Sequence, residues 1–316
     1  MESTAITQEK ELQTTTSAEL SPPPAENEEI EEVIPEYTQS ELLEKVINSY
    51  PPLPKVALML RDCAQDTCSS WCIEEVTGAI SDDPLLRDHL INLVNSPFYG
   101  FSNEIVNLRQ IVSLLGINNV ASIAIATFFE SSIHINVSPY GLEPEEFIIK
   151  SRKAVSFVSD WFSSIDKKFA QELIPCILLL RAGMVLFSKV LLEVRKDKAF
   201  LESLKANNYD ITLVENEFFG TDHLKILADL FEKWKFDDLI VESAKFIENP
   251  GEAPIEAMKN AYVLAIANAA FGPRGVQNKK KVSELVRQAR KQAVNINIGR
   301  LIEICPFTII LDDRAK

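Results

Sequence analysis

Three histidines, His89, His134 and His223, are the side chains of this chain best suited to acid–base or metal chemistry. They fall in three separate segments of the chain, so their spacing predicts no histidine cluster. A catalytic or structural zinc site normally needs about three or four protein ligands close together. The histidines therefore favour neither a bound metal nor metal-dependent hydrolysis.

Five cysteines are the other reactive side chains. Cys68 and Cys72 could share one face of a helix, with Cys63 just upstream, but no histidine and no CxxC pair accompanies them. The odd number of cysteines and the lack of an N-terminal signal segment predict reduced thiols in the cytoplasm. The sequence also contains no nucleophile elbow, phosphate-binding loop or GxGxxG motif, so we expect no cofactor and no covalent catalysis.

The net charge of −14 limits the partners of the protein. A surface of this sign repels nucleic-acid phosphates and anionic lipid, so we expect neither nucleic acid nor membrane as a partner. The most apolar run, residues 173–192, contains Arg181. An arginine near the centre of a membrane span costs about 3 kcal/mol on insertion scales, so a buried helix of a soluble protein is the better interpretation.

The composition predicts an all-α protein, because only 10 glycines are available for the tight turns of a β fold. Residues 1–37 are rich in Thr, Ser, Gln, Glu and Pro, and they predict a disordered acidic tail. Residues 38–312 are expected to form one domain of two helical halves, 38–137 and 138–312. The proposed boundary lies at a turn-rich Ser-Pro-Tyr-Gly loop.

Capping residues mark several helix ends. Thr38 and Glu41 have the spacing of a capping box, Asp83-Pro84 is a helix start, and Gly116 is expected to be a left-handed helix cap. Apolar periodicity then predicts helices at residues 69–80, 108–115, 118–129, 147–162, 169–192, 218–234, 239–247, 254–271 and 282–304.

A series of short motifs in residues 53–116 resembles the HDOD family, the output-domain relatives of the HD phosphohydrolases. A second, looser set of matches follows, and the resemblance covers about residues 39–300. The first set is Leu53-Pro54, Ile80–Pro84, Asn92–Ser96, Tyr99-Gly100, Gln110-Ile111 and Leu114–Gly116; the second is Gly220, Asp222 and His223 in a G-x-D-H turn, with Ala267-Asn268 as a late A-N pair.

The resemblance implies an all-α fold of two packed helical halves, of which the second is a degenerate HD-type phosphohydrolase fold. Family members generally act in bacterial signal transduction, and no common catalytic activity is established for them. We expect structural roles for the matching motif residues, namely Pro54, Asp83, Pro84, Asn95, Ser96, Gly116, Gly220 and Asp222.

The resemblance also places the metal ligands of an HD phosphohydrolase on this sequence. The first histidine falls near Lys150, the His-Asp pair falls at Leu180-Arg181, and the last aspartate falls at Asn268. Leucine cannot bind a metal, lysine and arginine repel one, and asparagine is a poor substitute for a carboxylate. The expected remnant is a cleft with Lys150, Leu180, Arg181, His223 and Asn268, without metal or catalytic residues.

Three functions remain open from the sequence. The first is a non-catalytic signal-transduction scaffold that acts on signalling proteins through protein–protein contacts. The second is a sensor that binds a nucleotide or another small anion in the remnant cleft, and the third is a phosphohydrolase with rearranged ligands. A buried Arg181 needs a partner, and the acidic composition favours a protein carboxylate over a bound anion. The basic run Lys279–Lys281, with further cations downstream, is interpreted as a solvated helix face.

Overall fold

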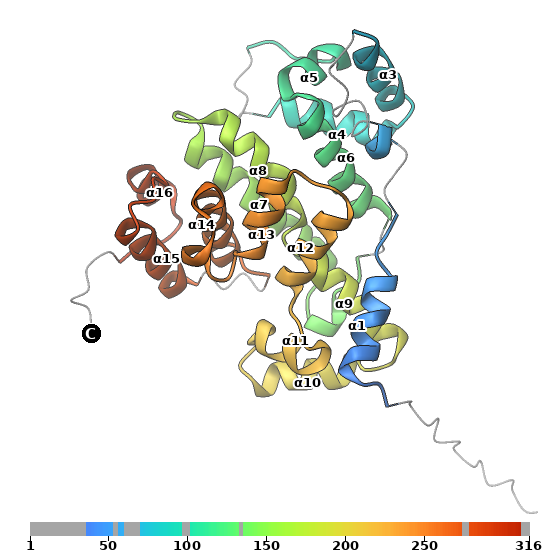
Figure 1. Cartoon of the computed structure of the whole chain (residues 1–316), viewed down its shortest axis with the longest axis vertical. Coiled ribbons are helices and arrows are strands. Elements are labelled where there is room, and N and C mark those ends of the chain that lie inside the picture. The colour runs from blue at the N-terminus through green and yellow to red at the C-terminus, as the bar shows by residue number, and fades with distance from the viewer. Residues whose placement is uncertain are drawn as a thin grey trace, which may run out of the picture. The chain divides into compact units, whose positions relative to one another are not determined.

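The computed structural model describes residues 36–52, 56–59, 70–96, 102–132, 135–273 and 278–310. The chain divides into two units, Met1–Ile34 and Pro35–Lys316, and every described residue belongs to the second. Within the described ranges the secondary structure is helical and contains no strand, in agreement with the predicted all-α class (Figure 1).

Most of the described residues lie in helices. In chain order they are α1 (Gln39–Asn48), α3 (Ser70–Ser81), α4 (Pro84–Val94), α5 (Leu108–Leu115), α6 (Ile117–Ser132), η1 (Ser138–Tyr140), α7 (Pro144–Phe162), α8 (Lys167–Leu179), α9 (Ala182–Glu193), α10 (Asp197–Ala206), α11 (Ile211–Phe219), α12 (His223–Lys233), α13 (Asp238–Lys245), η2 (Pro250–Glu252), α14 (Ile255–Ala270), α15 (Lys279–Lys291) and α16 (Ile298–Ile304).

Helices α3 to α6 form one packed group. Asp83 begins α4 as predicted: its Oδ1 accepts a hydrogen bond from the Leu86 amide at 3.0 Å, and Pro84 takes the first helical position. Asn95 ends this helix and joins it to the following segment, because its side chain bonds both the N–H and the C=O of Ile105 at 2.8 Å. Asp83, Pro84 and Asn95 therefore hold helix ends and connections.

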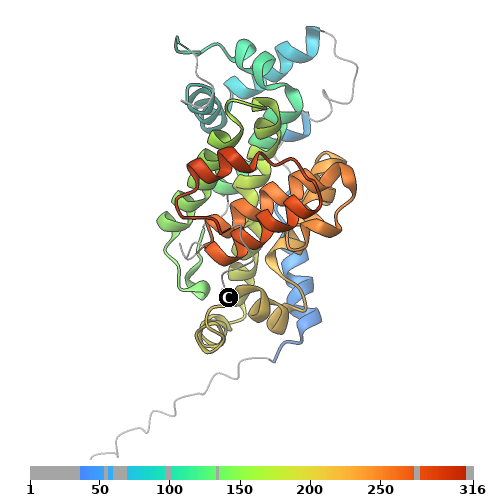
Figure 2. The same ribbon diagram turned by 90° about the vertical axis from the view of Figure 1, so that its left-hand side faces the viewer.

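The remaining helices form a second group around α8 and α9, most of whose side chains are buried. Helix α7 packs on α8, α12 packs on α9, and α13, α14 and α15 follow in a row in which each packs on the next. Helix α6 packs on α8 and so connects the two groups (Figures 1 and 2). The core helices α8 and α9 thus carry the segment that the sequence marks as the remnant site.

Helix α1 packs on α9 and α11, which belong to the second half of the sequence. Its capping box is confirmed, since Thr38 and Glu41 make both reciprocal bonds. Leu42 and Val46 are buried, and Gln39 Nε2 donates to the Glu217 carbonyl at 2.7 Å. Packing therefore crosses the proposed boundary at residues 137–138, and the division into halves stays a prediction.

Several helix predictions are wrong in detail. The predicted helix 169–192 breaks at Leu180-Arg181, and 282–304 is two helices, α15 and α16. Helix α12 begins only at His223, and α10 and most of α11 were missed. Gly116 ends α5 with φ 79° and ψ 150°, so it uses a positive φ that favours glycine without the left-handed helical ψ that was expected. Apolar periodicity does not reveal the break at Leu180-Arg181, because the residues on both sides of it are buried.

Among the described residues, the stretch Lys167–Glu193 is long and apolar enough to cross a membrane, and 89% of its most apolar part is buried inside the protein. A second candidate arises only if Leu108–Leu115 and Asn119–Phe129 are joined across a bend of 109°. Burial of this extent is what the core helix of a folded domain shows.

Candidate functional site

Arg181 lies at the break between α8 and α9, where the family resemblance places half of the HD ligand pair. Its side chain is among the largest fully buried ones, with 1% of its surface exposed. Nη1 donates to the Ser151 hydroxyl at 2.9 Å, and Nη2 donates to the carbonyl oxygen of Phe271. The guanidinium therefore joins three elements, namely α7, the start of α9 and the end of α14.

No carboxylate among the described residues forms an ion pair with Arg181, and its Nε has no hydrogen-bond partner there. The expected carboxylate partner is thus wrong, and two neutral oxygens take its place. Burial lowers the pKa of Arg181 to about 10, which still leaves the guanidinium charged at neutral pH. A buried cation without a counter-ion is an unusual and costly arrangement.

Lys150 and Asn268, two other residues of the expected remnant, lie on α7 and α14, the helices that Arg181 joins. Lys150 Nζ donates to the Pro273 carbonyl at 2.7 Å and pairs with Glu146 at 3.2 Å. Asn268, in the last turn of α14, has a buried Oδ1 that finds no hydrogen-bond partner among the residues that the structure describes. Leu180 is fully buried. Lys150, Arg181 and the end of α14 therefore lie at one junction, while their role in ligand binding stays a prediction.

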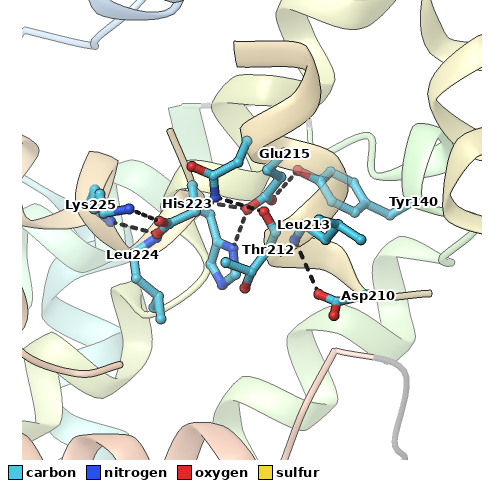
Figure 3. A network of polar contacts seen from close by, with 10 residues as sticks. Tyr140, Asp210, Thr212, Leu213, Glu215, His223, Leu224 and Lys225 are labelled. Atoms are coloured by element: carbon cyan, nitrogen blue, oxygen red, sulfur yellow. Dashed lines mark hydrogen bonds and ion pairs between the residues drawn. The ribbon is translucent and has the colours of Figure 1, made fainter. Parts of the chain in front are cut away.

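A second buried polar cluster lies at the junction of α11 and α12 (Figure 3). The carboxylate of Glu215 accepts hydrogen bonds from the Tyr140 hydroxyl at 2.6 Å and from the His223 amide at 2.9 Å, and its Oε2 lies 2.7 Å from Nδ1 of His223. Glu215 and Tyr140 are 0% exposed and His223 is 5% exposed. One carboxylate thus connects η1, α11 and α12.

Capping places His223 in this cluster. Asp222 is the N-cap of α12, accepts from the amides of Leu224 and Lys225, and pairs with Lys225 Nζ at 2.7 Å. The preceding Gly220 closes α11 with a left-handed conformation at φ 70°. These two motif residues fix the turn between α11 and α12, and the turn brings the backbone and the ring of His223 onto Glu215.

The electrostatics of the second cluster follow from its charges. Burial alone would lower the pKa of His223, but the charge and hydrogen bond of Glu215, helped by Asp222, raise it above its ordinary value. Burial and the neighbouring Glu215 raise the pKa of the Tyr140 hydroxyl. Burial opposes ionisation of Asp222, yet Lys225 lowers the pKa of that carboxyl. The cluster therefore favours the protonated form of His223 beside Glu215.

The two clusters adjoin each other. The positive charge of Arg181 acts on His223 and opposes its protonation. The start of α9 also touches the start of α12, since a Cβ on Gly183 would lie 2.7 Å from the His223 Cα. Only glycine allows this approach without moving a helix. The Leu180-Arg181 position and the G-x-D-H turn are thus parts of one buried region.

Among the described residues, no group of three or more His, Cys, Asp and Glu side chains is placed to hold a metal ion. His89 lies apart, on α4, with Nδ1 2.9 Å from the Thr127 hydroxyl. Pro54 and His134 lie outside the described residues. The sequence analysis missed Ser151, Tyr140 and Glu215. For Glu215 a signal existed in the sequence, because it is spaced by four residues from both Ile211 and Phe219, as on the buried face of a helix.

Comparisons with known proteins identify a family and solved structures with a similar fold. The family model of the HDOD domain matches residues 50–250. A virulence factor from Campylobacter jejuni subsp. jejuni is 37% identical, with 84% of this chain and 97% of that chain covered and a TM-score of 0.55. No curated protein matches the chain.

Two more distant solved structures show the same fold. A protein from Shewanella amazonensis SB2B, named provisionally as a phosphohydrolase, is 22% identical over 83% of this chain and 91% of its own, with a TM-score of 0.57. A protein from Marinobacter aquaeolei VT8, named provisionally as a signal transduction protein, is 17% identical over 82% and 65%, with a TM-score of 0.51. The fold is that of the helical HD-related domains, and the chain belongs to the HDOD domain family.

Proposed function

We propose that this protein is a non-catalytic regulatory module of bacterial signal transduction, and that it acts by binding other proteins. Its family and the name given to the Marinobacter protein support a regulatory role in general. Beyond this general role, we propose that the remnant HD site does not catalyse a reaction and that the protein passes on its signal through contacts with other proteins.

One observation supports the proposed loss of catalysis. The position that the HD resemblance assigns to a ligand pair holds Leu180, which is fully buried, and Arg181, whose guanidinium binds Ser151 and the Phe271 carbonyl. A fixed positive charge at this position repels a divalent cation, and the two bonds make the side chain part of the helix packing. The old site thus serves to hold α7, α9 and α14 together.

Hydrolysis assays test the proposal. The purified protein is incubated with p-nitrophenyl phosphate and bis-p-nitrophenyl phosphate in the presence of Mn²⁺, Fe²⁺ or Mg²⁺. We expect no turnover above the rate of the metal in buffer. Metal-dependent turnover that purifies with the protein and is lost on substitution of His223 or Asp222 would instead support a phosphohydrolase with rearranged ligands.

A second candidate function is a sensor for a nucleotide or another small anion. The observation that favours it is the buried charge of Arg181, which meets only neutral oxygens among the described residues, with Lys150 on the same side of the junction. Anionic groups bind well to such cations where water is excluded.

Thermal unfolding separates the two candidates. If the protein is a regulatory module without a ligand, GTP, ATP and inorganic phosphate should leave its melting temperature unchanged. The sensor predicts that one of them stabilises the protein, and that Arg181→Met removes this stabilisation while Lys189→Met, an exposed position on the same helix, keeps it.

A further inference from the structure

Helix α15 carries an unusual concentration of positive charge for this protein. In a chain with a net charge of −14, its 13 residues include six cations and one acidic residue, Glu284. Four of the six, Lys279, Lys280, Arg290 and Lys291, are exposed, and Lys281 is half-buried. We call these five side chains the basic face of α15.

The basic face lacks the carboxylate partners that accompany many cations elsewhere. Ion pairs occur on α1, α4, α7, α8, α12, α13 and α16, for instance Lys45 with Glu193 and Lys245 with Glu242. Within the described part of the chain, none of the five side chains of the basic face forms one. Their charge is therefore available to a partner.

The sequence of α15 also works against its own stability. Lys279, Lys280 and Lys281 occupy the first turn, and no acidic residue is there. The amino-terminal end of a helix carries partial positive charge, so cations in this turn are unfavourable, and they also repel one another. Three lysines in the first turn destabilise the helix, and no ion pair compensates for them among the described residues. A functional role is the natural explanation for such a feature.

Apolar surface borders the basic face. The segment after α16 runs back along α15: the Lys279 ammonium lies 6.0 Å from the centre of the Phe307 ring, and the Ile310 amide donates to the Ser283 hydroxyl at 3.0 Å. The side chain of Ile310 remains 52% exposed. A partner therefore meets both positive charge and an exposed aliphatic group.

We propose that the basic face of α15, with Ile310, is a docking surface for an acidic protein segment that carries aliphatic residues between its carboxylates. The proposal rests on the proposed function, because it supplies the surface through which a protein-binding module would act. A nucleic acid fits less well. Its long run of phosphates would extend beyond a helix of about 20 Å onto a strongly acidic protein.

A binding assay with the full-length protein tests the surface. The probe is a fluorescein-labelled peptide of glutamates interspersed with isoleucines, followed by fluorescence anisotropy at low ionic strength. We expect saturable binding that weakens as salt is added, and a loss of at least about tenfold in affinity in the variant Lys279→Glu/Lys280→Glu. Because acidic residues suit the first turn of a helix, this variant should fold at least as stably as the wild type.

The matched control is Lys167→Glu/Lys168→Glu, which makes the same change at two exposed lysines in the first turn of α8. This control should bind the peptide as the wild type does. No binding by the wild type, or an equal loss in both variants, overturns the proposal. Tighter binding of a short DNA duplex that is lost in the α15 variant also overturns it, in favour of nucleic acid. None of these results bears on the absence of hydrolysis, which the phosphoester assays decide separately.

Discussion

The two buried polar junctions of this protein differ in the partners of the charged side chain at their centre. At the junction of α11 and α12, Glu215 accepts hydrogen bonds from Tyr140 and His223. The raised pKa of His223 favours its protonated form beside this acidic side chain. At the junction of α7, α9 and α14, Arg181 is equally buried, but its partners are a hydroxyl and a carbonyl.

The difference indicates which junction the fold depends on more. Removing one member of a buried charged network leaves the others unpaired in a medium that does not solvate them, whereas neutral partners lose less. The Glu215 junction is therefore expected to be the main polar support of the fold. The Arg181 junction holds an excess positive charge where, by the family resemblance, a metal site once lay.

The largest effect should come from Glu215→Ala. This change removes the acceptor of three hydrogen bonds, one from the Tyr140 hydroxyl and two from His223, in a region where these groups are buried. We expect the free energy of unfolding, measured by denaturant titration, to fall by about 3–5 kcal/mol. Glu217→Ala, at an exposed position on the same helix, should change it by no more than about 0.5 kcal/mol. Equal effects of the two changes would show that the Glu215 junction is not special.

Gly183→Ala should have the next largest effect on stability, because Gly183 lies where the two junctions meet. The added methyl group would overlap the His223 backbone, so α9 and α12 must separate, at a cost of about 1–3 kcal/mol. The control is Gly78→Ala within α3, where a Cβ meets nothing within 4 Å. That change should be neutral or stabilising, since alanine favours helix. A tolerated Gly183→Ala would mean that the helices are less tightly packed there.

Arg181→Met should cost less than Glu215→Ala, about 1–2 kcal/mol. Methionine fills much of the same volume, and the losses are two hydrogen bonds to neutral oxygens. Chemical denaturation of Arg181→Met beside Lys189→Met gives the comparison. A loss as large as that of Glu215→Ala would reveal a charged partner of Arg181 and remove the contrast between the two junctions.

The smallest effect is a dependence on pH. The folded protein raises the pKa of His223 above its unfolded value of about 6.5, so the stability from this histidine is present below that pH and is lost as pH rises through the folded pKa. Glu215 and Asp222 favour the proton, while Arg181 opposes it. Unfolding of the wild type and of His223→Gln at a series of pH values should show their difference shrinking above that range. A difference that grows with pH would contradict the assignment.

Local signals in the sequence predicted the parts of this region that depend on neighbouring residues. Asp83 with Pro84, Thr38 with Glu41, and Asp222 were recognised because a cap acts within about four residues of itself. The break at Arg181 was missed as a feature of secondary structure, because Leu180 and the residues after it are apolar and buried on both sides. Its position came from the family resemblance instead.

Contacts between distant segments could not be predicted in the same way. Tyr140 and Glu215 are 75 residues apart, and Arg181 and Ser151 are 30 apart, so their pairing depends on how whole helices pack. Composition also misled: an acidic chain favoured a carboxylate for Arg181, but no carboxylate among the described residues pairs with it. Burial of an isolated charge is a property of the packed fold, and average charge says little about it.

The central claim is that the HD metal site has become a structural junction. Its most direct test is elemental analysis of the full-length protein after purification without chelators and again after incubation with Mn²⁺, Fe²⁺ or Zn²⁺ and desalting. We expect far less than one transition-metal ion per chain in each case, because the family resemblance assigns the ligand pair to Leu180 and Arg181, which do not bind metals. One tightly bound iron, manganese or zinc ion per chain would contradict it.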